Sequence, residues 1–455
     1  MSQPLTPALA LDPGSRLPGW VATAWRYGLS TSGPVATSGA HFLASLLFVR
    51  NLPASQFGLF SFVLVIVPFC MSIIAALLVL PVNNALGETQ ETRARIEAAC
   101  LKMNLILTVL AGATVFGFLM AARAPVTPAL LLAGFGASLT GRWFARCFAF
   151  VKGRAGAAIA SDLTYAGALV AGLGALVLRH HVEFTWAAAL LLTAALIGLV
   201  PFGAGFFRDQ CAAIANGRIR DYRAIFRDLT RWSLLGVILT ELTVNAHAYL
   251  VTFISGPGPF ALLAVGQILM RPASLVQSAL PDIERPGMTR AIAAKDDRKL
   301  ARMLGEFRFA LLAVWLVTVA LAVAILVWAP HLLLKKGYAQ HDVLLVTLIT
   351  ATIMLVRSFR TPPATFMQAA GEFKALVGIG THTSVISIVL TLAFLLTLGP
   401  IASLCGILAG EVIIVLKLNR MMRDWKTRQF FLASEASLEK LSATERASPA
   451  SGRHG

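Results

Sequence analysis

Long hydrophobic runs separated by short polar turns make up most of this chain. Between residues 28 and 420, mostly apolar stretches of about 20 residues recur, the length that an α-helix needs to cross a membrane. The pattern predicts an all-α polytopic membrane protein with about twelve transmembrane helices. We expect these helices at 28–48, 59–85, 98–120, 129–151, 157–178, 185–207, 233–254, 258–281, 305–329, 342–360, 375–397 and 401–419.

The composition agrees with a membrane protein and narrows its chemistry. The 455 residues are 57% hydrophobic and only 13% charged, whereas soluble domains are nearer a quarter charged. The five cysteines are scattered, without the paired spacing of a disulfide framework or of a metal site. We therefore expect no metal and no bound cofactor, apart from a proton or Na⁺ that could drive transport.

The basic residues predict the orientation. Of the 39 Lys and Arg, five lie in one alternating set of loops, and nearly all the others lie in or beside the opposite set. Since the cytoplasmic side carries the excess of positive charge, both termini should be cytoplasmic, in a multi-pass protein of the inner membrane. The net charge of +17 then reflects this topology and attraction to anionic inner-leaflet lipid, rather than nucleic-acid binding.

Two segments outside the spans complete the predicted organisation. Residues 208–232 are basic, with Ile219, Tyr222, Phe226 and Leu229 three or four residues apart, which is typical of an amphipathic helix on a membrane surface. The expected order is a cytoplasmic segment (1–27), an N-lobe of six spans (28–207), the linker helix (208–232), a C-lobe of six spans (233–419) and a basic, largely disordered tail (420–455).

The two lobes show an internal repeat. Pro81 and Pro281 end the second and eighth spans 200 residues apart, and "RWFAR" (142–146) in the fourth span has a counterpart, "RSFR" (357–360), in the tenth. A glycine beside a charged residue follows each arginine motif, in "KGR" (152–154) and "GEF" (371–373). Because six crossings return the chain to its starting side, the lobes should be parallel repeats.

Several arginines fall inside the predicted spans, where a charged side chain costs about 3 kcal/mol on insertion scales. A guanidinium can escape this cost by reaching the interface, or it can face a cavity that binds an anion. Its planar fork suits phosphate, to which it gives two parallel hydrogen bonds. The candidates for a cationic, pyrophosphate-binding cavity are Arg142, Arg146, Arg271, Arg357 and Arg360.

Other polar residues in the spans have two readings. Ser30, Thr37 and His41 in the first span, with Asn245 and His247 in the seventh, could line a cavity for sugar hydroxyls. Small and hydroxyl residues also serve helix packing in membranes, so packing remains an alternative. The acidic residues Asp162, Glu241 and Glu411 could bind a coupling ion or pair with a neighbouring arginine.

Several motifs resemble the Wzx-type polysaccharide-unit flippases, a branch of the multidrug, oligosaccharidyl-lipid and polysaccharide exporter superfamily. "LLFVRNLPASQFGLFSFVLVI" (46–66) is similar to their first-loop signature, and "FALLAVGQILMRPASLVQSALPDIER" (260–285) to their proline-containing eighth span. "LLLKKGYAQHDVLLVTLI" (332–349) and "TFMQAAGEFKALVGIG" (365–380) are similar to the loop before the tenth span and the turn after it.

The resemblance covers about residues 25–425 and carries expectations of its own. It implies two six-helix bundles in a V that opens alternately to either face. It implies translocation of polyprenyl-pyrophosphate-linked oligosaccharide for polysaccharide biosynthesis, with polymerase and chain-length components as further candidate partners. It also favours a monomer.

Two rival functions remain open. A multidrug or cation antiporter would favour acidic groups in the first-half cavity, but the first span has no carboxylate and the mid-span charges are mostly arginine. A membrane-embedded polysaccharide polymerase or ligase would need catalytic groups on the outside, where the longest loop, around 331–341, is about a dozen residues and has no paired carboxylates.

Overall fold

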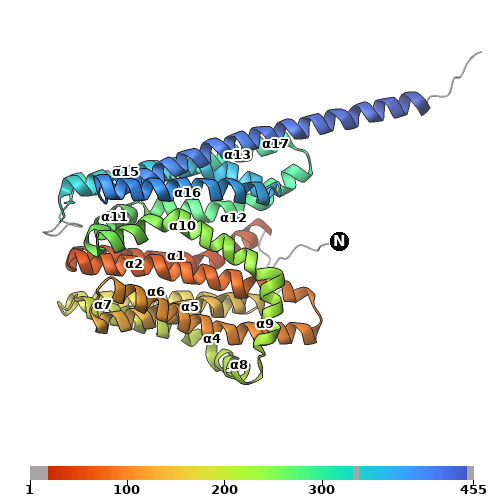
Figure 1. Cartoon of the computed structure of the whole chain (residues 1–455). Helices are drawn as coiled ribbons and strands as arrows, with labels where there is room; N and C mark the ends of the chain where they lie inside the picture. The colour runs from red at the N-terminus through yellow and green to blue at the C-terminus, as the bar shows by residue number, and fades with distance from the viewer. Residues whose placement is uncertain (1–18, 331–337, 448–455) are drawn as a thin grey trace, which may run out of the picture.

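The computed structural model describes residues 19–330 and 338–447, and the side chains discussed below lie within 32–330 and 338–428. Over this range the chain forms helices joined by short turns and contains no strand (Figure 1). The predicted all-α fold class is therefore confirmed. Residues 1–18, 331–337 and 448–455 lie outside the described residues, and so does most of the predicted outer loop around 331–341.

The first half of the molecule, here called the N-half, is the lower bundle in Figure 1. Its helices are α1 (Gly19–Asn51), α2 (Ala54–Ile74), α4 (Gln90–Ala121), α5 (Val126–Val151), α6 (Ala155–Leu178) and α7 (Phe184–Ile197). A π-helical turn, η1 (Ala75–Val79), extends α2 into α3 (Leu80–Asn84) and η2 (Ala85–Gly87). The Thr89 hydroxyl caps α4 by accepting a hydrogen bond from the Thr92 backbone N–H at 3.4 Å.

The second half, the C-half, is the upper bundle. Its helices are α10 (Arg231–Ile254), α11 (Pro257–Leu269), α12 (Arg271–Ala293), α13 (Asp297–Trp328), α15 (Gln340–Ala369), α16 (Phe373–Leu398) and α17 (Ser403–Ala447). Helix α11 begins at Pro257, the favoured first-turn position, after Gly256 at φ +96°. Together α11 and α12 form the predicted eighth span, but the span is bent by 61° where Pro272 follows Arg271.

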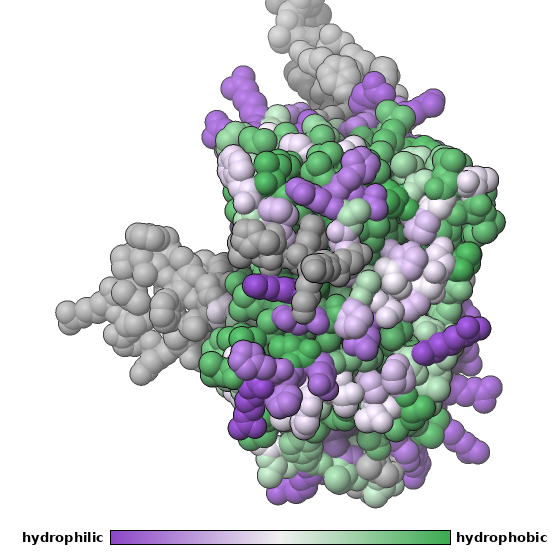
Figure 2. All heavy atoms as spheres, turned by 90° about the vertical axis from the view of Figure 1, so that its left-hand side faces the viewer, coloured by the Kyte–Doolittle hydropathy of each residue, from purple (hydrophilic) through white to green (hydrophobic). Residues whose placement is uncertain are grey.

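The helices suit a membrane. Eight described helices are long and apolar enough to cross it. The number is ten if two bent segments each count as one span: α10 by itself, and α11 together with α12. Helices α5 and α17, which complete the predicted twelve, do not meet this standard, yet α5 packs against α2, α4, α6 and α7, and α17 packs against α15 and α16. The end view shows hydrophobic side chains over much of the visible surface, with hydrophilic ones scattered among them (Figure 2). The chain is a multi-pass membrane protein.

Helix pairings repeat in the same order in both halves. Helix α1 packs on α6 as α10 packs on α16, α4 on α5 as α13 on α15, and α5 on α7 as α15 on α17. The repeated glycines also have a structural role, because Gly153 (φ +71°) ends α5 and Gly371 (φ +80°) ends α15 in the left-handed conformation. This is the arrangement expected of parallel repeats.

Two predicted segments differ from the structure. Residues 208–232 do not form one helix: α8 (Gly203–Asn216) and α9 (Ile219–Ile225) meet at Gly217, and α9 continues through η4 (Phe226–Thr230) into α10. The tail is not disordered from residue 420, since α17 continues to Ala447. No Gly or Pro occurs between Gly410 and Pro449, so nothing in the sequence stops this helix earlier.

The halves meet at the end that carries the turns at 52–53, 122–125 and 255–256. Phe62 of α2 is the centre of an aromatic cluster there, with ring centroids 5.7 Å from Tyr249 and from Phe253 and 6.0 Å from Phe260. Gly58 lets α2 approach α11 closely, because a Cβ atom at this position would overlap the Pro257 carbonyl. This contact closes one end of the interface between the halves.

Candidate functional site

The two arginines of the fourth predicted span share one carboxylate. Arg142 Nη1 and Arg146 Nε each lie 2.8 Å from a different oxygen of Asp162, which projects from α6. One helical turn separates the arginines on α5, so both face the same neighbour. Because two guanidinium groups meet a single carboxylate, this N-half cluster keeps one net positive charge.

Further contacts fix the N-half cluster in place. The Arg142 guanidinium lies 4.5 Å from the centre of the Tyr165 ring, and the Tyr165 hydroxyl lies 2.8 Å from His41 Nε2 on α1. The Ser161 hydroxyl donates to the Gly198 carbonyl at 2.6 Å and accepts from Arg142 at 3.3 Å. Gly33 of α1 packs directly on Asp162, where an added Cβ atom would overlap Oδ2.

The C-half holds the equivalent cluster on α15. Arg357 Nε lies 2.7 Å from Glu411 Oε1, and Arg360 Nη1 lies 2.9 Å from Oε2. Glu411 comes from α17, the sixth span of this half, whereas Asp162 comes from the fifth span of its own half. Again two arginines and one carboxylate leave one net positive charge.

Arg271 is different from the other four. It is the first residue of α12, at the bend between α11 and α12, and it lines two adjoining cavities. Its side chain forms no ion pair or hydrogen bond with any residue in the described part of the chain. A guanidinium held between the halves without a counter-charge is the strongest local attraction for an anion.

The first of these cavities, about 210 Å³, belongs mainly to the N-half. Thr37, His41, Trp143 and Leu139 line it together with Arg142, Arg146, Asp162 and Arg271. The Thr37 hydroxyl and His41 Nδ1 are buried there without a hydrogen-bond partner among the described residues. Cationic and hydrogen-bonding groups therefore converge on one small space.

The second cavity, about 530 Å³, opens toward the C-half and borders the first at Leu64, Pro68 and Arg271. Its polar lining consists mostly of amides and hydroxyls: Ser61, Asn245, Gln267, Ser274, Ser278 and Thr350, with His247 and Arg357. His247 Nε2 lies 2.6 Å from the Gln267 amide, and its Nδ1 has no partner among the described residues. The larger cavity is thus mostly a hydrogen-bonding surface of uncharged groups, with Arg271 and Arg357 as its two cationic groups.

Glu241 occupies a third cavity, about 560 Å³, between α10 and α16. The Tyr249 hydroxyl and the Asn245 amide donate to one of its oxygens at 2.7 and 3.0 Å. No Lys or Arg in the described chain pairs with it, in contrast to Asp162 and Glu411. Of the three acidic candidates, Glu241 is therefore the carboxylate that an ion could approach.

The structure brings most of the predicted site residues together. Arg360 pairs with Glu411 but lines none of these three cavities, and the Ser30 side chain lies outside the described residues. Sequence reasoning missed Tyr165, Trp143 and Gln267. Tyr165 lies one helical turn after Asp162, so a polar aromatic residue on the same face was an available signal. The described residues contain no group of three or more His, Cys, Asp or Glu that could hold a metal ion.

Comparison with solved structures identifies the fold. An inward-facing multidrug resistance MATE family transporter of the MOP superfamily matches with a TM-score of 0.65 at 13% identity, over 90% of this chain and 96% of that one. The lipid II flippase MurJ, in an inward closed conformation, matches with a TM-score of 0.62 at 13% identity, over 93% and 94% of the two chains. The protein has the fold of these transporters.

A third similar structure is a MOP superfamily transporter from Pyrococcus furiosus, described as having a binding pocket of reverse polarity that suggests a different function. It matches with a TM-score of 0.58 at 13% identity, over 87% of this chain and 93% of that one. The sequence matches no protein-family profile and no curated protein. The structural similarity establishes the fold. At 13% identity it does not identify the cargo, which has to be argued from the site.

Proposed function

We propose that this protein is a flippase that moves polyprenyl-pyrophosphate-linked oligosaccharide units across the cytoplasmic membrane for polysaccharide biosynthesis. The single observation that carries the proposal is Arg271, an arginine without a counter-charge at the junction of two cavities. On either side of it lies a cluster that keeps one net positive charge. The central space therefore attracts a multiply charged anion.

A lipid pyrophosphate has the charge that this arrangement needs. It carries at least two negative charges, and a low-dielectric cavity strengthens their attraction to fixed guanidinium groups. The 210 Å³ cavity, with Arg142, Arg146 and Arg271 on its wall, would hold the pyrophosphate. The pairing with Asp162 lowers the cost of burying two arginines while leaving charge for the cargo.

The sugars would occupy the 530 Å³ cavity. Amides and hydroxyls can both donate and accept hydrogen bonds, as sugar hydroxyls do, and the side chains of Phe260 and Ile353 supply apolar surface for the sugar faces. The lining, which is mostly uncharged, also suits a cargo whose charge is confined to the pyrophosphate. Arg271 would contact the boundary between the two parts of the cargo.

The rival functions receive less support from the site. A cationic drug would need a free carboxylate in the two central cavities, but the acidic residue in their lining is Asp162, which is engaged by two arginines. A polymerase or ligase would need an acid and a base facing the activated sugar outside the membrane. The halves meet at that predicted outer end through an aromatic cluster instead.

Glu241 is our candidate for ion coupling. A proton or Na⁺ bound at this carboxylate would compete with the hydrogen bond from Tyr249, whose ring packs on Phe62 of the other half. Ion binding would thereby weaken the packing of Tyr249 on Phe62, which closes one end of the interface between the halves. Glu241→Gln should abolish the dependence of export on the ion gradient, and export that still follows the gradient would contradict the assignment.

The test uses a strain that lacks the protein. Polyprenyl-linked sugars are labelled on intact spheroplasts with a membrane-impermeant lectin, before and after permeabilisation. Complete oligosaccharides that become accessible only after permeabilisation place the block at translocation, as we expect. Complete but unpolymerised units already outside would indicate a polymerase, and an unchanged lipid pool would indicate a drug antiporter.

A further inference from the structure

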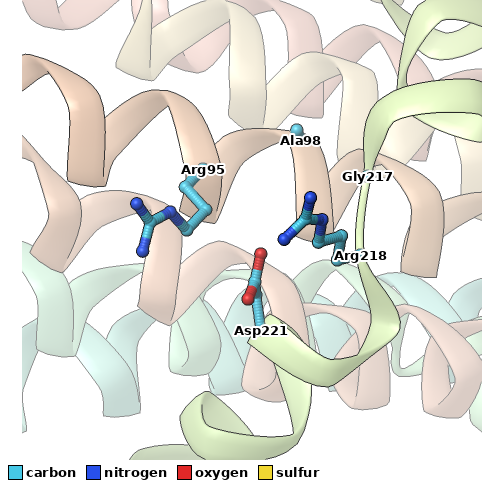
Figure 3. A pocket seen from close by; sticks show the side chains of 5 residues that line it. All are labelled: Arg95, Ala98, Gly217, Arg218 and Asp221. Carbon is cyan, nitrogen blue, oxygen red and sulfur yellow. The ribbon is translucent and has the colours of Figure 1, made fainter.

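A separate polar pocket lies where the linker helices cross α4, away from the transport cavities. It has a volume of about 370 Å³ and is lined by Arg95, Ala98, Gly217, Arg218 and Asp221. Figure 3 shows the Asp221 carboxylate pointing into the space between the guanidinium groups of Arg95 and Arg218. Two cationic groups and one anionic group thus surround one opening.

The pocket is held together by close contacts between α4 and the linker. Gly217 approaches α4 so closely that an added Cβ atom would lie 2.7 Å from the Ala98 carbonyl oxygen. Lys102 Nζ donates to the Gly217 carbonyl at 3.0 Å, and the Asn104 amide donates to Gln210 Oε1 at 3.1 Å. These bonds fix the turn between α8 and α9, and with it the position of Arg218 and Asp221.

The charged groups of the pocket are available. Within the described chain, neither Arg218 nor Asp221 forms an ion pair, and Arg95 pairs only with Glu91, at 3.1 Å and one helical turn away. That pair is solvent-exposed, so it is weak and easily exchanged. The pocket can therefore accept a ligand that carries a negative and a positive group.

Its surroundings place the pocket beside lipid. Ile219, next to Arg218 in the chain, is 54% exposed, and Phe207 on α8 is 43% exposed. On α4, large exposed apolar side chains begin at Leu105, roughly three helical turns after Arg95. Apolar side chains exposed beside guanidinium groups are typical of a headgroup layer, where acyl chains and phosphates are both within reach.

We propose that this pocket binds the headgroup of an aminophospholipid. Arg95 and Arg218 would bind the phosphate, and the Asp221 carboxylate would accept hydrogen bonds from the primary ammonium group. The occupant would join α4 of the N-half to the linker that continues into α10 of the C-half. Lipid binding would thereby hold the linker on the N-half, whatever cargo the transporter carries.

The experiment measures lipid binding to the purified full-length protein in detergent, by native mass spectrometry. The probes are phosphatidylethanolamine, phosphatidylglycerol, phosphatidylcholine and soluble phosphorylethanolamine. We expect phosphatidylethanolamine to bind about tenfold more tightly than the other two lipids, since phosphatidylglycerol lacks an amine and the choline ammonium cannot donate a hydrogen bond.

The variants test the ammonium contact and the phosphate contacts of the headgroup separately. Asp221→Asn should remove the preference for phosphatidylethanolamine while phosphatidylglycerol still binds, and Arg95→Ala with Arg218→Ala should weaken both lipids about tenfold. The matched controls are Asp297→Asn and Arg298→Ala, both exposed at the start of α13. A preference that survives Asp221→Asn, an equal loss in the controls, or equal binding of soluble phosphorylethanolamine would overturn the proposal.

Discussion

The arginine clusters of the two halves have the same charge but different surroundings. In the N-half, the side chains of Arg142, Arg146 and Asp162 are 5%, 13% and 4% exposed. In the C-half, Arg357 and Arg360 are 15% and 26% exposed around a Glu411 that is equally buried. The N-half cluster also has Tyr165 against it and Gly33 packed on its carboxylate.

The comparison separates what the repeat conserves from what it does not. Both halves place two arginines on the fourth span and end that span with a left-handed glycine. The carboxylate that pairs with both arginines comes from the fifth span in one half and the sixth in the other. The net charge of each cluster is therefore maintained by different helices, which suggests that the charge itself matters for function.

The largest predicted effect concerns stability. Asp162→Asn leaves two nearly buried guanidinium groups without a counter-charge, and we expect a loss of about 3–5 kcal/mol in unfolding free energy. Glu411→Gln should cost less, because the side chains of Arg357 and Arg360 are less buried. Thermal unfolding in detergent would measure both, with Asp342→Asn, an exposed carboxylate, as control. Equal losses would show that the two clusters do not differ in burial as described.

A smaller effect is expected from close packing against the N-half cluster. Gly33→Ala places a methyl group in overlap with Asp162 Oδ2, so α1 must shift at a cost of about 1–3 kcal/mol. Gly39→Ala is the matched control on the same helix, since nothing lies within 4 Å of an added Cβ atom there. If both variants unfold at the same temperature, Gly33 has no role in holding the cluster.

The smallest stability effect should come with a clear loss of export. Arg360→Ala leaves Arg357 and Glu411 as a neutral pair, so the fold should lose only about 1 kcal/mol while the cluster loses its net charge. Export should fall, and it should fall in Arg142→Ala as well, with both variants still inserted in the membrane. Full export by both would mean that the cluster charges serve only to stabilise the fold.

Much of the fold follows from the sequence because hydrophobic length and turn residues act locally. The apolar runs predicted the helical elements, and the repeated arginine and glycine motifs predicted the matching order of the halves. The helix break at Gly217 was not predictable from apolar spacing, because it depends on the close contact with Ala98 of α4. Likewise, the bend at Arg271 depends on the local effect of Pro272 together with packing against α15.

The sequence could predict which residue types form the candidate site, but not which of these residues form ion pairs with each other. The sequence marks Arg142, Arg271 and Asp162 as unusual because charge is costly in a span. Which arginine pairs with which carboxylate depends on how helices distant in sequence face each other. Only the three-dimensional arrangement separates Arg271, which has no ion pair in the described chain, from the four arginines that share Asp162 and Glu411.

The most direct test of the account is the leaflet assay with Arg271 variants expressed in the deletion strain. Arg271→Ala should trap complete lipid-linked oligosaccharide in the inner leaflet, Arg271→Lys should restore part of the export, and Arg298→Ala should export normally. Each variant is first checked for membrane insertion and thermal stability. If Arg271→Ala is inserted, stable and exports at the wild-type rate, the central arginine does not bind the cargo and the proposed flippase mechanism is wrong.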